Sequence, residues 1–103
     1  MSRDIPRRTQ ILLSVQRALL GEVSANLRAV TAHDDEQVLV VFYFDGPISE
    51  EDAETVSVIH TEIIADFFPE VEVEVKCVRL DAPTRIEDDG LRIYRRKEPS
   101  CRD

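Results

Sequence analysis

Acidic side chains have the most evident capacity for chemistry in this chain, because 21 of its 103 residues are Asp or Glu. Carboxylates in pairs serve glycoside hydrolysis, and carboxylates in clusters bind Mg²⁺ or Ca²⁺. Glu70, Glu72 and Glu74 alternate with valines, so on a strand they project from one face at intervals of about 7 Å. The neighbouring sequence supplies no converging Asn or Asp ligands and no calcium-loop motif. We therefore favour a solvated strand face that discourages edge pairing over a metal site.

Another acidic group directly follows Ser49. Ser49 suits a helix N-cap, Asp52 stands three residues later in capping-box position, and acids in a first turn complement the helix dipole. The same carboxylates can oppose an Arg cluster on another protein. Helix capping is the favoured interpretation and protein contact is the alternative, for the group Glu50, Glu51, Asp52 and Glu54.

Two more acidic groups fall in predicted turns and loops. The first is expected to be turn chemistry, and it comprises Asp34, Asp35 and Glu36. The second lies in the longest predicted loop and is either plain solvated charge or a contact surface, and it comprises Glu87, Asp88 and Asp89.

The nucleophiles and histidines do not form a recognisable catalytic or metal motif. His33 and His60 stand outside any H-E-x-x-H or G-x-S-x-G pattern, and Cys77 and Cys101 share no CxxC spacing. The chain has three glycines and no phosphate-binding loop. We expect a protein without cofactor, metal or enzymatic activity.

Charge is sorted along the chain. The net charge is −14 over residues 31–90, whereas residues 1–30 and 91–103 each carry +3. An acidic body repels nucleic acid and anionic membranes, and it attracts basic proteins through long-range steering. We expect the terminal cations to pair with the body's own acids rather than to form a nucleic-acid patch; they are Arg7, Arg8, Arg92, Arg95, Arg96 and Lys97.

Hydrophobic periodicity predicts two helices and four strands. Helical spacing covers residues 8–20 and the stretch from the Ser49 cap to just before Pro69, and alternation or apolar runs cover 27–32, 37–44, 70–80 and 91–96. The order α-β-β-α-β-β predicts a single α/β (α+β) domain over residues 1–103, with two helices packed on one face of a four-stranded mixed sheet. The ordered core is expected over about 7–97, with an exposed loop at 81–90 and a polar tail at 98–103.

The strand at 37–44 is apolar on both faces, with Val38, Val40 and Phe42 on one side and Val41 and Tyr43 on the other. It is therefore expected at the centre of the sheet. Its second face, which also holds Leu39, must be covered by a loop, the C-terminal segment, a second subunit or a partner.

No apolar run approaches the roughly 20 residues of a membrane span, and the first residues lack the apolar stretch of a signal peptide. We expect a cytoplasmic protein.

Three stretches, RTQILLSVQRALLGEV followed by NLRAV, FYFDGPISEEDAE and HTEIIADFFPE, carry a resemblance over about residues 7–97. The chain resembles a family of small acidic bacterial proteins that includes immunity proteins of contact-dependent growth inhibition (CdiI-type) systems. The resemblance implies a non-enzymatic protein that binds the C-terminal toxin domain of a cognate effector, often a basic nuclease, and blocks it inside the producing cell.

The resemblance assigns no contact residues, so these come from charge and exposure. The predicted partner-binding residues are Glu50, Glu51, Asp52, Glu54, Glu72, Glu74, Glu87, Asp88 and Asp89. Two alternatives stay open. One is self-association or binding of a housekeeping partner through Leu39, Val41 and Tyr43, and the other is a carboxylate-based hydrolase.

Overall fold

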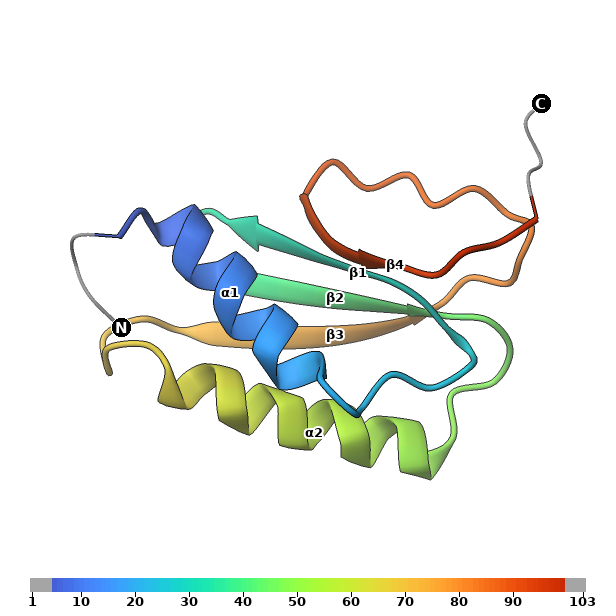
Figure 1. The fold of residues 1–103 in the computed structure, drawn as a ribbon, viewed down its shortest axis with the longest axis horizontal. Helices are drawn as coiled ribbons and strands as arrows, with labels where there is room; N and C mark the ends of the chain where they lie inside the picture. Colours follow the sequence, from blue (N-terminus) through green and yellow to red (C-terminus); the bar gives the residue numbers. More distant parts are fainter. Residues whose placement is uncertain (1–4, 100–103) are drawn as a thin grey trace.

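The computed structural model describes residues 5–99 and contains six elements in the predicted order (Figure 1). They are α1 (Arg7–Leu19), β1 (Leu27–Asp34), β2 (Val38–Phe44), α2 (Glu50–Ala65), β3 (Val73–Arg79) and β4 (Leu91–Arg95). The predicted α+β class is confirmed. None of the helices in the described part of the chain combines the length and the apolar character needed to cross a membrane.

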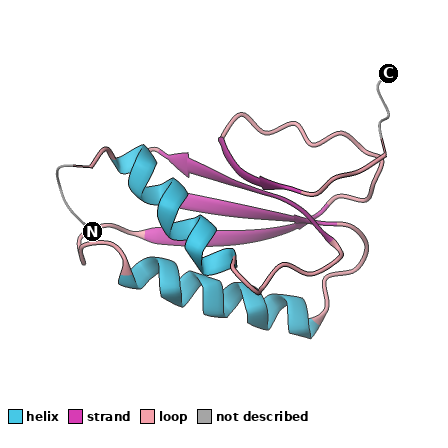
Figure 2. Cartoon of the chain, in the orientation of Figure 1, coloured by secondary structure: helices cyan, strands magenta, loops and turns pink. Residues whose placement is uncertain are grey.

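The four strands form one mixed sheet in the order β3-β2-β1-β4. β1 pairs antiparallel with β2 and with β4, whereas β2 and β3 are parallel and are joined by α2. A parallel pair requires such a crossover, and a helix packed on the sheet supplies it. Both helices lie over the same face of the sheet (Figure 2), as predicted.

The hydrophobic core lies between this face and the helices. β2 contributes Val38, Val40 and Phe42, all fully buried, and α1 and α2 contribute Ile11 and Ile59 among others. The helical stripes and the alternation seen in the sequence account for these contacts.

The start of β3 differs from the prediction. Pairing with β2 begins at Val38↔Val73, and the backbone N–H of Val71 donates to the carbonyl of Phe68 in a turn. Of the predicted row of glutamates, only Glu74 lies in the strand, and Glu70 and Glu72 precede it. The prediction of a continuous acidic strand face was therefore wrong, because the first residues of the alternating run form the turn after α2.

The second face of β2 is covered in part by the chain's own loop between β3 and β4. Asp88 in that loop accepts hydrogen bonds from Thr31 and Tyr43, and Val41, which pairs with Thr31 and neighbours Tyr43 along the strand, is only 5% exposed. Of the coverings left open by the sequence, the loop is the one observed. The surface that self-association through Leu39, Val41 and Tyr43 would need is therefore mostly covered within the chain.

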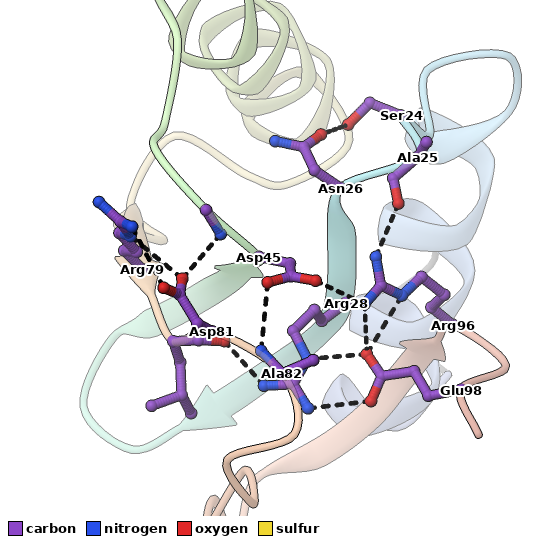
Figure 3. A network of polar contacts seen from close by, with 12 residues as sticks. Ser24, Ala25, Asn26, Arg28, Asp45, Arg79, Asp81, Ala82, Arg96 and Glu98 are labelled. Carbon is purple, nitrogen blue, oxygen red and sulfur yellow. Dashed lines mark hydrogen bonds and ion pairs between the residues drawn. The ribbon is translucent and has the colours of Figure 1, made fainter. Parts of the chain in front are cut away.

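A polar network joins the end of β2 to the start of β1 and the segment after β4 (Figure 3). Arg28 is the extra residue of a β-bulge between Leu27 and Ala29, and its side chain is 3% exposed. Its Nε and Nη2 donate to the two carboxylate oxygens of Glu98 at 2.7 and 2.9 Å, and its Nη1 donates to the carbonyl of Leu80 at 2.7 Å. Glu98 is therefore part of the folded domain and not of a polar tail, which corrects the boundary predicted at residue 97.

The same network extends to four more charged side chains. Arg96 pairs with Glu98 at 2.8 Å and with Asp45 at 3.1 Å, and Arg79 pairs with Asp81 at 3.0 Å. Three arginines and three carboxylates thus balance one another at this end of the sheet.

The terminal cations follow the predicted pairing only in part. Arg7 pairs with Asp34 at 3.3 Å and Arg96 pairs within the network. Across residues 5–99 the other four form no ion pair, and they are Arg8, Arg92, Arg95 and Lys97. For these four the expected pairing with the body's acids was wrong. Residues 100–103 of the predicted tail lie outside the described residues.

Substitution Glu98→Ala tests the network. It leaves the buried guanidinium of Arg28 without its carboxylate, so we expect a loss of about 3 kcal/mol in the free energy of unfolding at pH 7. The control Lys97→Ala alters an exposed side chain and is expected to stay within about 0.5 kcal/mol of wild type. Urea denaturation measures both, and equal stability of the two variants contradicts the assignment.

The same pair predicts a pH dependence. The hydrogen bond from Arg28, with Arg96 adding to it, lowers the pKa of Glu98 to about 2 despite the opposing effect of burial, against an ordinary pKa of about 4.3. A depressed native pKa contributes stability above the unfolded value and loses it as pH falls toward the native value. The stability difference between wild type and Glu98→Ala should therefore shrink between about pH 4.3 and pH 2.

Candidate functional site

The N-terminus of α2 is held by the predicted capping box. The hydroxyl of Ser49 accepts from the backbone N–H of Asp52 at 3.0 Å, and a carboxylate oxygen of Asp52 accepts from the backbone N–H of Ser49 at 3.2 Å. Asn26 also donates to Asp52 at 2.9 Å, and this bond, with those to Ser49, lowers the pKa of Asp52 against the effect of burial. Asp52 thus has a structural role that its acidic neighbours do not share.

Four carboxylates on α2 are exposed and make no ion pair with another residue of the described range 5–99, and they are Glu50, Glu51, Glu54 and Glu62. The helix contains no Lys or Arg to offset them. Glu50 and Glu54 are like charges four residues apart, an arrangement that weakens a helix by a few tenths of a kcal/mol. Glu62 lies in the last four residues of the helix, where the dipole disfavours an acid. The stability of the helix therefore does not explain why positions 54 and 62 hold glutamate.

One side of α2 lies next to α1. Glu54, Val58, Glu62 and Asp66 are spaced four residues apart and so form a row along the helix. At its end, Asp66 accepts hydrogen bonds from Ser14 at 2.7 Å and from Arg17, both on α1. The row therefore begins at the second turn of α2 and ends against the C-terminal half of α1.

The loop between β3 and β4 is held to the sheet by Asp88, whose side chain is 5% exposed. One of its oxygens accepts from the hydroxyls of Thr31 and Tyr43 at 2.8 and 2.6 Å. The other accepts from the backbone N–H of Gly90 at 2.7 Å and lies 3.0 Å from Nε2 of His33. Asp88 therefore anchors the loop, and only its neighbours Glu87 and Asp89 are exposed as predicted contacts.

The ionisation of this cluster follows from the same contacts. Burial alone would raise the pKa of Asp88, but hydrogen bonds from Tyr43, Gly90 and Thr31 and the nearby His33 lower it below its ordinary value. Burial and the hydrogen bond to Asp88 raise the pKa of Tyr43 to about 12. The carboxylate thus acts as an anionic acceptor between neutral hydroxyl donors.

Gly90 permits the close approach of the loop to β1. A Cβ at this position would lie 2.7 Å from the carbonyl oxygen of Ala32 and 2.8 Å from the ring of His33. The ligand atoms of His33, Asp88 and Asp89 also lie within 4.8 Å of one another. Each oxygen of Asp88 already has two polar neighbours, so the cluster is accounted for as a hydrogen-bonded anchor.

The nine predicted contact residues fall in three separate places. Glu50, Glu51, Asp52 and Glu54 lie at the start of α2, beyond the end of β2. Glu72 and Glu74 lie at the start of β3, beside Val38 and Leu39. The seven residues of β2 separate these two groups by about 20 Å. Glu87, Asp88 and Asp89 lie in the loop, of which Asp88 reaches the β1–β2 hairpin.

Glu62 was not among the predicted residues, although the sequence contains its signal. It is an exposed acid near the C-terminus of a helix that lacks any basic residue, and it stands four residues after an exposed valine. The structure thus defines a small acidic α+β domain in which α2 carries uncompensated acids, whereas Asp52 and Asp88 have structural roles.

The comparison with protein families assigns the chain within this class. The model of the MafI2 immunity protein family matches residues 8–98, and the chain belongs to this family. A search of curated proteins found no match. The chain is therefore a bacterial immunity protein with a toxin-neutralising function, and its partner is a cognate toxin. The immunity class expected from the resemblance is confirmed, and the contact-dependent growth inhibition type stays a prediction.

Substitution Asp88→Asn tests the loop anchor. The substitution removes the negative charge, and with the amide NH2 at Oδ2 the hydroxyls of Thr31 and Tyr43 must change from donors to acceptors, so the charge-assisted bonds become weaker neutral ones. We expect a loss of about 2 kcal/mol in the free energy of unfolding. Amide hydrogen exchange over residues 81–90 should accelerate. The matched control Asp89→Asn changes an exposed neighbour and should leave stability and exchange near wild type. Identical stability and exchange rates in the two variants would contradict the assignment of Asp88 as the residue that anchors the loop.

Proposed function

We propose that this immunity protein is a non-enzymatic inhibitor that binds a basic toxin domain, of the contact-dependent growth inhibition type, in the cytoplasm of the producing cell. The acidic surface of α2 is its main contact. The observation that carries the proposal is that α2 has five carboxylates and no cation, and that four of them, Glu50, Glu51, Glu54 and Glu62, make no ion pair with a residue in the described part of the chain.

A nuclease is the class of toxin that this surface fits best. Nucleases hold nucleic acid with Lys and Arg, and their clefts are positively charged before substrate binds. A folded acidic surface can occupy such a cleft in place of phosphates. Long-range attraction then raises the association rate to about 10⁸ M⁻¹s⁻¹ or more at low salt.

The acids elsewhere are less suited to this role. Asp52 is engaged by Ser49 and Asn26, and Asp88 is buried by the sheet. Glu72 and Glu74 stand near the opposite end of β2. Glu50, Glu51 and Glu54 are about 20 Å from Glu72 and Glu74 along β2. The C-terminal half of α2 returns to the start of β3, where His60 lies 2.7 Å from the carbonyl oxygen of Val73, so Glu62 is the acid of α2 nearer to the second group.

Growth rescue identifies the partner. The protein is co-expressed with individual toxin domains of the contact-dependent growth inhibition type, and the proposal expects growth to be restored with one of them and a 1:1 complex to form. The rescued toxin is expected to be a nuclease whose cleavage of nucleic acid stops in the complex. Absence of rescue by every such toxin would contradict the proposal.

Charge reversal then tests the surface. Glu54→Lys with Glu62→Lys avoids the capped first turn of α2 and places a cation where the dipole favours one. We expect association with the rescued toxin to slow about tenfold at low salt, with a weaker salt dependence. The matched control, Glu72→Lys with Glu74→Lys, makes the same change in net charge outside α2, at the start of β3 and the residue before it. An equal effect of the two pairs would show that net charge acts and that α2 does not.

A further inference from the structure

The large hydrophobic side chains that remain exposed are concentrated in the helix layer. Among residues 5–99 they are Leu13, Leu20, Val23, Val58 and Ile64, with exposures of 48%, 75%, 41%, 46% and 48%. Leu13 lies on α1 and Leu20 and Val23 immediately follow it, whereas Val58 and Ile64 lie on α2. Since both helices cover one face of the sheet (Figure 2), this layer presents the apolar surface to solvent.

Leu13 and Leu20 lie beside Arg17, the residue of α1 whose side chain contacts the end of α2, and Val23 lies in the turn after α1. Leu13, Arg17 and Leu20 follow helical spacing and form one stripe, and Arg17 reaches across to Asp66 at the end of α2. Glu22 and Ser24, which flank Val23, share a small cavity with Asp52 and Thr55 of α2. The end of α1 and the turn after it therefore run along α2 from Asp66 back toward its first turns, an arrangement visible in Figure 1.

Val58 is exposed on α2, about 60° around the helix from Thr55. It stands three residues after Thr55, which lines the shared cavity, and eight residues before Asp66, which contacts α1. Glu54 and Glu62 flank it at four residues on either side, and Glu51 precedes it by two turns. Ile64 is two residues from Asp66, about 200° around the helix, and belongs to another side of α2.

We propose that Leu20, Val23 and Val58, with Leu13 at one end, form an apolar strip that anchors the toxin. The acids Glu51, Glu54 and Glu62 form its rim. The strip fits a partner surface with an apolar projection flanked by Lys or Arg, because the rim is anionic and has no cation on α2. This inference rests on the proposed function and adds to it the residues that determine the lifetime of the complex.

The strip and its rim have different kinetic roles. Rim charges act at a distance and set the association rate and its salt dependence. Apolar side chains act only on contact, where a few buried anchors determine most of the binding energy and the dissociation rate. An acidic surface without an apolar centre would recruit any basic protein, whereas the strip selects the one whose shape matches.

Alanine substitutions separate the two roles. Leu20→Ala and Val58→Ala remove exposed side chains, and both favour helix or leave it unchanged. Ile64→Ala is the matched control, since Ile64 is as exposed as Val58 on the same helix but on another side. Each variant is measured by surface plasmon resonance against the toxin domain identified by growth rescue, at low and high salt.

We expect Leu20→Ala and Val58→Ala each to accelerate dissociation about tenfold with association changed by less than about twofold. Ile64→Ala should change neither rate. Unchanged dissociation rates in the first two variants, or an equal change in Ile64→Ala, overturn the inference. The proposed function would still stand in that case, provided that growth is rescued and charge reversal slows association. A wild-type protein that binds no toxin overturns the proposed function itself.

Analytical ultracentrifugation of the free protein tests whether a second copy of this chain, and not the toxin, covers the strip. The inference expects the wild-type protein to sediment as a monomer at micromolar concentrations. A wild-type dimer that Leu20→Ala dissociates would make the strip a contact between copies of this chain and would overturn the assignment to the toxin.

Discussion

The requirement to bury both faces of β2 determines the arrangement of the remaining elements. On one face, Val38, Val40 and Phe42 pack beneath the two helices. On the other, Val41 is buried and Tyr43 is tied to the loop through Asp88. Both faces of the central strand are thus largely used within the chain. Among residues 5–99 the exposed large hydrophobic side chains lie on the two helices or directly after α1, and α2 also carries exposed acids.

The charged side chains fall into two groups, those paired within the fold and the exposed acids of α2. Arg28, Arg79 and Arg96 are matched by Asp45, Asp81 and Glu98, so this end of the sheet is locally neutral. The exposed acids of α2 have no such partners in the described range and tolerate repulsion along the helix. One set of charges therefore stabilises the fold, and we propose that the other set contacts a basic toxin.

The sequence predicted the features that depend on local spacing. The element order, the Ser49–Asp52 capping box and the single-sided helix layer are confirmed, because periodicity and capping act within a few residues. The buried roles of Arg28 and Asp88 and the inclusion of Glu98 in the fold were not predicted. Each depends on contacts between residues at least 45 positions apart, and for Arg28 also on a bulge. The nine contact residues remain a prediction, now limited by the buried Asp88 and the capping role of Asp52.

Carboxyl footprinting of the free protein and of its toxin complex locates the contact surface, because it reports on every exposed acid in one experiment. We expect Glu51, Glu54 and Glu62 to lose reactivity in the complex while Glu72, Glu74 and Asp89 keep theirs. Protection of the second set with an unchanged first set would contradict this expectation.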